Sequence, residues 1–585
     1  MRFARIRISF LLPLLVAILY FLTIPSNHIH AQTIIINPNT TFQTITGWEA
    51  SHGVGQDEPS YSTFKNHFND PGGLFDQAVE LGITRLRVVV KSGAENSHDY
   101  WADYRDAGFP LGSTCADPED YARCPYKRWR CHRYAMVDDN TSTDVINWNG
   151  FHFGELDRDV RDIVIPFKQK LASKGRSLHI NFIHNAFRGQ MTENGCPSGL
   201  QYILDGNPPN YAEFMLASTL YLRNTFGSQG INPNTWEVIL EPDLSGWNGT
   251  EIGNAIVATA SKLTANGFNP RFVAPSVTNM ANTVGYFNAI NAVPGALQYL
   301  EELSYHRYGG VSDANLQAIA SLGTQYGVNT SMLEHRGSGY QDLHKDLILG
   351  NNSSWEQHVL AGANVDQAGK LLLMDLTNPN NPIISYANRT KTLYQYFHNI
   401  HPGAVRIGAS PTTSTNYLPS AFINNPGNPN QQYVAIVGLE QVANGTPFTV
   451  GNLPIGSYRV TYSTNNTGSG SGLTYVPYNV LPGTYNVTSS QPNLSITKPD
   501  ASNSAVVAIV QNVVSVPTPT ATPTPSPNPN DLTGEGIVDL QDIIRLIVYI
   551  FNPSTQLAPG SNPNIDGSNS VNLLDVIAIV SIIFS

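Results

Sequence analysis

Charged residues are scarce in this chain. Only 13% of its 585 residues are Asp, Glu, Lys or Arg, about half the usual share of a globular domain. The net charge is −11, and no basic run follows the N-terminus. This balance argues against a nucleic-acid partner. Gly and Pro are plentiful instead, at 48 and 39 residues, which favours a secreted, loop-rich and partly β protein.

Long apolar runs are missing after the first 31 residues, so no later segment is expected to span a bilayer. At the N-terminus three arginines precede an apolar run over 8–24, and small Ala31 closes the segment. This pattern is typical of a signal peptide over residues 1–31. An uncleaved anchor is the alternative, because the run approaches spanning length. We expect cleavage, export and no membrane attachment afterwards.

Cysteine is also rare. The four cysteines, all in polar loop sequence, are Cys115, Cys124, Cys131 and Cys196. After export one or two disulfides are expected, and three connectivities are open. A zinc site is less favoured, because the spacing is not C-x-x-C and only His132 is adjacent. Three of the cysteines fall in a long irregular insertion over 98–154, whose aromatics predict an ordered binding loop.

Short apolar runs alternate with helical periodicity through most of the chain. The expected strands lie at 47–50, 86–90, 178–184, 236–240, 271–277, 300–308, 330–334 and 371–376. The expected helices lie at 74–81, 156–174, 211–226, 251–266, 284–292, 315–326, 355–363 and 390–399. This alternation predicts a parallel sheet. Eight strands is the number of a (β/α)8 TIM barrel.

The chain is too long for one domain. Short alternating strands with Gly, Asn and Pro turns predict an antiparallel β-sandwich over 404–514. A Pro/Thr-rich stretch over 515–530 is typical of a semi-rigid linker. The expected order is therefore a signal peptide (1–31), a catalytic barrel (32–403), the sandwich, the linker and a small α-helical calcium-loop domain (531–585).

Two of the expected strands end on a glutamate, Glu241 on strand four and Glu334 on strand seven. Active sites of such barrels lie at the C-terminal strand ends, and glycoside hydrolysis uses two carboxyl groups. Three strand–helix units of roughly 31 residues separate them, the unit size of a barrel of about 250 residues. We predict Glu241 as acid/base and Glu334 as nucleophile, with Arg336 helping to keep Glu334 ionised. Two structural, salt-bridged glutamates are the less favoured interpretation.

Other polar and aromatic residues near the strand ends are candidate substrate contacts. They are Trp48, Glu49, His184, Asn185, Trp247, His306, Tyr308 and Arg336. Four tryptophans, at 48, 101, 148 and 247, are candidate sugar-stacking platforms, with core or loop packing equally expected. A metal bound by His184, His306 and His335 is less favoured, because histidines in a sugar cleft more often bond hydroxyls. We therefore expect no catalytic cofactor.

Two loops in residues 531–585 carry oxygen side chains at calcium-loop spacing. The first offers Asp531, Thr533, Glu535, Ile537, Asp539 and Asp542. The second offers Asn564, Asp566, Ser568, Ser570, Asn572 and Asp575. Gly536 and Asn569 occupy the sharp-turn position, and each loop precedes an apolar helix. Two loops in tandem predict two Ca²⁺ ions, and a solvated Asn/Asp-rich turn is the less favoured alternative.

Three stretches resemble clan A glycoside hydrolases, most of all family 30. They are FQTITGW over 42–48, SYHRY over 304–308 and FHNIHPGAVRI over 397–407. The resemblance covers roughly residues 33–512 and implies a retaining β-glycosidase of polysaccharide or glycoconjugate. It also implies that residues 33–45 join the sandwich. One departure is Leu240, where the clan has an Asn that hydrogen-bonds the sugar 2-hydroxyl; Asn185 and His184 are candidate substitutes.

The tail resembles a type I dockerin, which implies two calcium ions and a cohesin-bearing partner. The chain would then be extracellular, at a cell surface or in a multienzyme complex. Leucines at 540, 573 and 574 stand among the partner-reading positions, where Ser or Thr is common. The alternative for the whole chain is a non-catalytic carbohydrate-binding or surface-scaffold protein on a degenerate barrel, which Leu240 motivates. The sugar, its linkage, and endo or exo action stay open at this stage.

Overall fold

The structure is a computed structural model. It describes residues 32–108, 114–137, 142–363, 369–380, 382–468, 476–499, 504–513, 528–534 and 537–584. These fall into two compact units, which divide between Asn512 and Val513. The expected signal peptide and most of the expected linker lie outside the described residues. Among the described residues, no helix combines the length and the apolar character needed to cross a membrane.

Eight parallel strands close into a barrel in the larger unit. They are β2 (Gly47–Ser51), β3 (Ile83–Lys91), β4 (His179–Asn185), β5 (Thr235–Glu237), β6 (Phe272–Asn279), β7 (Leu300–Gly309), β8 (Asn329–Glu334) and β9 (Asn352–Ala363). Strand β9 pairs in parallel with both β8 and β2, which closes the ring. Closure leaves no strand edge among the eight. The predicted parallel barrel is confirmed.

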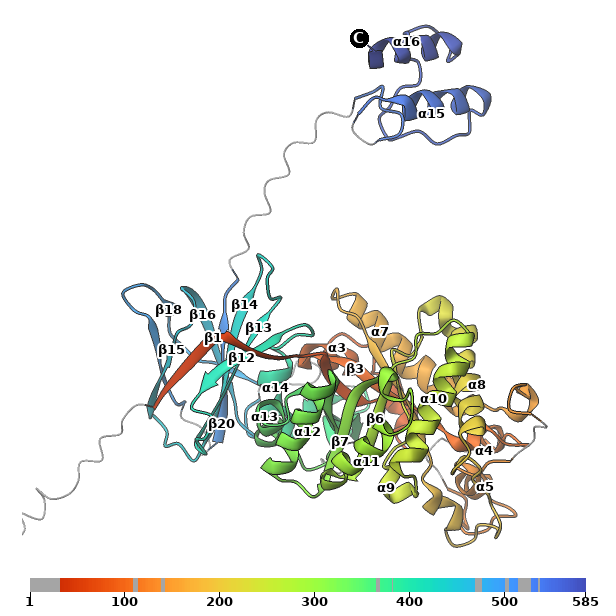
Figure 1. Cartoon of the computed structure of the whole chain (residues 1–585), viewed down its shortest axis with the longest axis vertical. Helices are drawn as coiled ribbons and strands as arrows, with labels where there is room; N and C mark the ends of the chain where they lie inside the picture. The colour runs from red at the N-terminus through yellow and green to blue at the C-terminus, as the bar shows by residue number, and fades with distance from the viewer. Residues whose placement is uncertain are drawn as a thin grey trace, which may run out of the picture. The chain divides into compact units, whose positions relative to one another are not determined.

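Helices surround the barrel on its outside, as Figure 1 shows for α10, α11 and α12. The long ones are α3 (Leu74–Leu81), α6 (Gly154–Asp159) and α7 (Ile165–Ala172) joined by a π-helical turn (Val160–Val164), α8 (Pro208–Phe226), α10 (Gly249–Ala265), α11 (Thr283–Asn291), α12 (Asp313–Tyr326), α13 (Tyr340–Ile348) and α14 (Asn388–Phe397). Helix α10 starts with a capping box between Asn248 and Glu251, which satisfies two otherwise unpaired amides. Helix α13 was not predicted.

The eighth barrel strand differs from the prediction. Residues 355–363 were expected as a helix and 371–376 as the eighth strand. The structure places the eighth strand at β9, while β10 (Lys370–Asp375) lies outside the ring and pairs with β9 and β11 (Ile383–Tyr386). A barrel strand is buried on both faces, so it lacks the simple alternation of a half-buried strand. In β9, polar residues that face the barrel interior give the sequence a pattern similar to that of an amphipathic helix.

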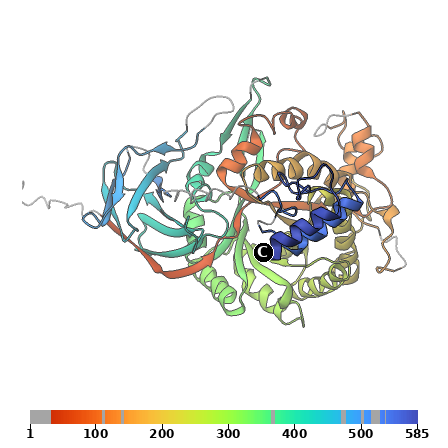
Figure 2. The ribbon, with the colours of Figure 1, turned by 90° about the horizontal axis from the view of Figure 1, so that it is seen from above.

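The β-domain is one curled sheet of ten described strands, mostly antiparallel, rather than two separate sheets. They are β1 (Gln32–Thr44), β12 (Val405–Ser410), β13 (Tyr417–Asn424), β14 (Gln432–Glu440), β15 (Pro447–Gly451), β16 (Gly456–Ser463), β17 (Asn479–Val480), β18 (Tyr485–Val487), β19 (Asn493–Thr497) and β20 (Ser504–Gln511). Strand β1 pairs antiparallel with β12 and parallel with β15. In Figure 2 this red N-terminal strand runs along the sheet. The chain therefore starts in the β-domain before it enters the barrel.

Buried hydrogen bonds join the barrel to the β-domain. Gln395 of α14 donates to Ser463 Oγ at 2.7 Å and accepts from Thr461 Oγ1 at 2.8 Å. Arg406 Nε donates to Gln43 Oε1 at 2.7 Å, and Gln43 Nε2 donates to the Leu347 carbonyl at 3.0 Å. Buried polar groups that have hydrogen-bond partners favour a single arrangement of the barrel against the β-domain.

The smaller unit contains two helices, α15 (Leu540–Phe551) and α16 (Leu573–Phe584). A small apolar core joins them. Its buried members are Leu532, Ile543, Leu546 and Ile579. Each helix follows one of the predicted calcium loops.

The barrel interior contains charged side chains toward the N-terminal ends of its strands. Arg85 on β3 donates from Nε to Glu49 Oε2 at 2.7 Å and pairs through Nη1 with Glu302 Oε1 at 2.7 Å. All three side chains are at most 1% exposed. Buried charges persist only when they are paired and hydrogen-bonded, so Arg85 keeps two carboxylates compatible with the core.

We expect Arg85→Met to destabilise the larger unit by about 3–5 kcal/mol, because it leaves two buried carboxylates without their cation. The measurement is the unfolding midpoint in guanidinium. The control is Arg105→Met, whose side chain is 55% exposed and pairs with Asp106. Equal midpoints for the two variants would contradict the structural role of this network.

Candidate active site

The C-terminal ends of three barrel strands bring Glu241, His306 and Glu334 together. One carboxylate oxygen or ring nitrogen from each side chain lies within 4.8 Å of those from the other two. Glu241 follows β5 and adopts a left-handed φ of 52°. This conformation is uncommon for a residue with a Cβ and marks functional positions. Pro242 then begins the short helix α9 (Pro242–Ser245), so the turn holds the Glu241 carboxyl at the barrel mouth.

Glu334, the last residue of β8, is surrounded by donors. Arg87 Nη1 donates to its Oε2 at 2.9 Å, and the Tyr308 hydroxyl donates to its Oε1 at 3.0 Å. His358 Nε2 lies 3.4 Å from the same Oε1. Burial alone would raise the pKa of Glu334, but His358, His306 and Arg87 together lower it to about 2. Glu334 is therefore ionised at neutral pH.

Glu241 has a different environment. Its Oε1 lies 3.1 Å from His306 Nδ1, and its side chain is 11% exposed. His306 is fully buried, so its ring holds the Glu241 carboxyl in one orientation. One carboxylate is thus held by several donors and the other by a single imidazole. The two carboxyl groups therefore have different hydrogen-bonding environments.

Arg87 is the residue that sequence reasoning missed most clearly. Besides Glu334, it contacts Glu237 through Nε at 2.7 Å and through Nη2 at 2.5 Å. The expected helper, Arg336, is exposed, and its backbone carbonyl accepts from Gly369 N at 3.2 Å. The correction is that Arg87 contacts Glu334. Arg85 and Arg87 are two residues apart on an apolar strand, so both side chains project to the same face. This spacing is the sequence feature that indicates an inward-facing Arg87.

Strand β9 supplies two more groups that the prediction missed. His358 approaches Glu334, and Glu356 is fully buried. Burial raises the pKa of Glu356 well above its usual value. Both residues were overlooked because this segment was expected to be a helix. Their inward placement follows from the strand's membership in the barrel.

Two predicted substrate contacts belong to the core instead. Trp48 is fully buried, stacks on Phe397 with ring centroids 4.7 Å apart, and donates from Nε1 to the Ile400 carbonyl at 2.8 Å. Glu49 is fully buried against Arg85. Neither side chain is accessible to a sugar. Burial of this kind depends on distant residues that strand patterns do not reveal.

His184 and Trp247 are also buried outside the site. His184 packs against Phe214 of α8, with ring centroids 5.2 Å apart, and burial lowers its pKa to about 3. Trp247 is 2% exposed and packs edge-on against Tyr211. The three histidines of the metal alternative are not assembled, because the His184 side chain packs against α8. Of the four candidate platforms only Trp148 is exposed, at 47%, within the insertion.

Asn185 is the last residue of β4 and is buried near the chain segment that precedes Glu241. Leu240 N donates to the carbonyl of His184, the residue before Asn185, at 3.1 Å. Asn185 is 7% exposed, and its Oδ1 has no hydrogen-bond partner among the described residues. Tyr308, 39% exposed, presents a ring at the same mouth. The unbonded Oδ1 is consistent with the expected role of Asn185 as a substitute for the polar side chain that Leu240 lacks.

The described part of the insertion holds one disulfide and one end of a second. These join Cys115 to Cys124 and Cys131 to Cys196, so all four thiols are bonded and none is available as a zinc ligand. Helices α4 (Tyr100–Asp106) and α5 (Pro125–His132) pack around a small aromatic core. That core consists of Trp101, Tyr104 and Trp129.

Comparison with known proteins yields a fold but no family. No family profile matches the sequence, and no curated protein matches it either. Among solved structures, the chain is similar to a GH30 endoxylanase from Clostridium papyrosolvens C71, with a TM-score of 0.50 and 17% identity, covering 82% of this chain and 100% of that one. A conserved exported protein from Bacteroides fragilis gives a TM-score of 0.52 at 14% identity, with the same coverage. Xylanase C from Talaromyces cellulolyticus gives 0.50 at 14%, again with that coverage.

The lowered pKa of Glu334 predicts a pH-dependent contribution to stability. The ionised carboxylate stabilises the fold above its ordinary pKa near 4.5, and this contribution is lost as pH falls toward 2. The stability difference between wild type and Glu334→Gln should therefore shrink by on the order of 2 kcal/mol between pH 7 and pH 3. Denaturant titrations across this range measure it. Glu301→Gln, near the start of β7, is the control. A constant difference for Glu334→Gln would contradict the prediction.

Proposed function

We propose that the barrel is a retaining glycoside hydrolase that cleaves β-glycosidic bonds of a polysaccharide or glycoconjugate by double displacement. The observation that carries this proposal is the Glu241–Glu334 pair, which comes from the C-terminal ends of β5 and β8 and has an oxygen of each carboxyl group within 4.8 Å of the other. Retaining enzymes hold their carboxyl groups about 5–5.5 Å apart, whereas inverting enzymes need about 6.5–9.5 Å for an intervening water.

In the first step Glu334 attacks the anomeric carbon of the sugar. A bond forms between a Glu334 oxygen and this carbon while the glycosidic C–O bond breaks, and Glu241 gives its proton to the leaving oxygen. Arg87 and the Tyr308 hydroxyl hold Glu334 by its two oxygens. Their donors keep the nucleophile ionised and aimed before substrate arrives.

In the second step water hydrolyses the covalent intermediate. Glu241, now a carboxylate, takes a proton from water, and the hydroxide oxygen bonds to the anomeric carbon as the bond to Glu334 breaks. Both glutamates return to their starting states. His306, 3.1 Å from Glu241, keeps this carboxyl facing the same oxygen position in both steps.

Similarity in fold supports this assignment. Two of the similar solved structures are a GH30 endoxylanase and a catalytic domain of a GH30 xylanase. A shared fold raises the expectation of glycosidase chemistry, while the site itself must carry the argument. We therefore take a β-linked polysaccharide as the substrate class.

We further infer that the chain acts outside the cell. The N-terminal sequence has the pattern of a signal peptide, and two disulfides suit an oxidising compartment. The smaller unit is proposed to bind two calcium ions and to dock onto a cohesin-bearing partner. Leu540 and Leu573, 62% and 60% exposed, lie at the starts of its two helices and are available to such a partner.

The two loops of the smaller unit suit calcium. The position-12 carboxylates, Asp542 and Asp575, are fully buried and accept backbone amides of their own loops, including Leu532 N and Ile565 N, each at 2.7 Å. Asn564, at position 1 of the second loop, has a buried Oδ1 without a hydrogen-bond partner among the described residues. Oxygen donors gathered in this way match the preference of a hard cation. Glu535, a predicted ligand, lies outside the described residues.

A non-catalytic carbohydrate-binding or surface-scaffold protein is the second candidate function. Leu240 favours it, because the residue before the acid/base carries no polar group for the sugar 2-hydroxyl. The contacts of Glu334 with Arg87, Tyr308 and His358 favour the enzyme instead. Hydrolysis of glycans by the wild-type protein distinguishes the two candidate functions.

Substitution of the pair tests the mechanism. Glu241→Gln should slow hydrolysis by about 10²–10⁴-fold for substrates whose leaving group needs a proton, and much less for activated aryl glycosides. Glu334→Gln should abolish turnover of both kinds and prevent labelling by an activated 2-fluoro sugar. Steady-state rates and peptide mass spectrometry measure these effects. Full activity of Glu334→Gln would remove the nucleophile assignment, and no turnover of any glycan by wild type would favour the scaffold function.

Calcium should order the smaller unit. Adding Ca²⁺ to the calcium-free full chain should raise the thermal midpoint of the second unit, because a ligand that binds only the folded state stabilises it. Calorimetry of wild type and of an Asp542→Ala/Asp575→Ala variant measures the shift. Equal responses of the two proteins would contradict the calcium sites, while the barrel transition serves as an internal control.

A further inference from the structure

Two adjoining cavities lie where the barrel meets the β-domain. Their volumes are about 550 and 560 Å³, and they share Gln317, Ile348 and Leu349 as lining residues. Neither lining includes a member of the candidate active site. In Figure 1, α13 lies on the side of the barrel that faces the β-domain. Ligand pockets commonly measure about 300–1,000 Å³, so each of these cavities, which together we call the seam groove, has room for a ligand.

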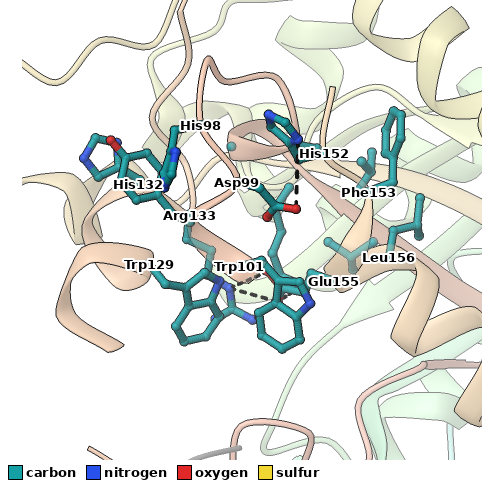
Figure 3. A pocket seen from close by; sticks show the side chains of 16 residues that line it. His98, Asp99, Trp101, Trp129, His132, Arg133, His152, Phe153, Glu155 and Leu156 are labelled. Carbon is teal, nitrogen blue, oxygen red and sulfur yellow. Dashed lines mark hydrogen bonds and ion pairs between the residues drawn. The ribbon is translucent and has the colours of Figure 1, made fainter. Parts of the chain in front are cut away.

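The cavity inside the insertion is far smaller. Its volume is about 40 Å³, which is room for about three water molecules. Figure 3 shows Trp101, Trp129 and Arg133 among the side chains around it. The Arg133 guanidinium lies 4.6 Å from the Trp129 ring centroid, and its Nε donates to Glu155 Oε1 at 3.1 Å. The insertion is therefore packed against itself, whereas the seam groove is open enough for an organic ligand.

An aromatic ring lines the end of the seam groove near strand β1. Phe42 of β1 is 45% exposed. The guanidinium of Arg406, on the neighbouring strand β12, lies 3.7 Å from its ring centroid. Arg406 is itself fixed, because its Nε donates to Gln43 Oε1 at 2.7 Å. The cation–π contact holds the ring in one orientation, and an accessible aromatic ring held in this way offers an apolar surface to the C–H face of a sugar.

Uncharged hydrogen-bonding groups line much of the seam groove. Exposed amides and hydroxyls of α12 lie in the same cavity lining as Phe42, at Gln317, Ser321, Thr324 and Gln325. The loop 411–416, between β12 and β13, adds the hydroxyls of residues 412–415 to the other cavity. Ser414 Oγ accepts from Tyr417 N at 3.0 Å, which holds this loop in a turn. Hydroxyls and amides both donate and accept hydrogen bonds, so they suit the hydroxyls of a sugar.

A buried imidazole in the lining is a second, independent indication of a ligand. His344 of α13 is 5% exposed, and its Nδ1 has no hydrogen-bond partner among the described residues. Burial lowers the pKa of His344 to about 4, and the charges of Arg406 and Lys345 lower it further. The ring is therefore neutral at pH 7 and offers a hydrogen bond rather than a charge. A buried polar atom without a partner is costly, and a ligand hydroxyl would remove that cost.

The charged side chains of the lining already have partners. Lys345 Nζ donates to Asp313 Oδ1 at 2.7 Å, and Glu440 Oε1 accepts from Gln341 Nε2 at 2.7 Å. Together with Arg406, the lining holds two positive and two negative side chains. An acidic ligand would add a charge without a partner, which is costly in a partly desolvated site. The lining therefore favours a neutral ligand.

We propose that the seam groove is a second glycan-binding site, which holds a neutral stretch of a β-linked polysaccharide apart from the catalytic pair. The choice of a β-linked glycan rests on the proposed hydrolase function, whereas the groove is a separate cavity. Binding at two sites of one protein raises the effective concentration of the chain at each of them. The groove would therefore increase activity on long polysaccharides and leave activity on small aryl glycosides unchanged.

The first test locates the glycan on the full-length Glu334→Gln protein, which should not consume the probe. The probes are neutral β-linked gluco-, galacto- and xylohexasaccharides, with an acidic hexagalacturonate for comparison. Hydrogen–deuterium exchange followed by mass spectrometry should show slower exchange in the loop 411–416 with at least one neutral probe. No protection of this loop by any neutral probe would overturn the groove. Stronger protection by the acidic probe would overturn the assignment of a neutral ligand.

Two variants at exposed positions give a second measurement on otherwise wild-type protein. Phe42→Ala and Gln317→Ala should each raise KM for the polysaccharide substrate by about tenfold and leave kcat/KM for an aryl glycoside unchanged. Ile455→Ala, 70% exposed in the β-domain and outside both linings, is the matched control and should keep both values.

The outcomes separate the groove from the hydrolase. Wild-type KM values for both groove variants on the polysaccharide would overturn the role of the groove and leave the hydrolase standing. Protection of the loop 411–416 by a neutral probe, together with no hydrolysis of any glycan by wild type, would overturn the hydrolase and support the groove as a binding site.

Discussion

One buried guanidinium organises the barrel mouth. Arg87 holds Glu237 through two nitrogens and Glu334 through the third. Because desolvating a carboxylate is costly, an ionised Glu334 can exist at this depth only beside such a partner. The proposed nucleophile therefore belongs to an ion network in the barrel interior. Support of this kind fixes a reactive group before substrate binds.

The barrel and the loops above it contribute different properties. Strands β5, β7 and β8 set the distance between the proposed acid/base and nucleophile, because their ends are fixed by the closed sheet. The insertion follows β3, and the disulfide Cys131–Cys196 ties it to the loop after β4. Xylanases of 14–17% identity have a similar fold, and one fold can carry loops of different structure. Specificity in such enzymes is carried by loops placed on a common scaffold.

Part of the site could be predicted from local pattern. Glu241 and Glu334 each end an apolar strand, and His306 and Tyr308 lie at the end of another, so strand register places all four at one mouth. His358 and Glu356 were missed because β9 is buried on both faces and carries polar residues inward. Trp48 and Glu49 were assigned to the substrate because their partners, Phe397 and Arg85, are distant in sequence.

The sequence by itself determined the strand–helix alternation, the two glutamates at strand ends and the tandem oxygen-rich loops. These features depend on residues within one element or on the order of elements. Both can be read directly from the sequence. Only the tertiary structure decided the disulfide pairing, the use of Arg87 rather than Arg336, and the burial of Asn185. Each of these depends on which strands become neighbours when the ring closes. That choice follows from packing and burial over the whole barrel, which no local pattern contains.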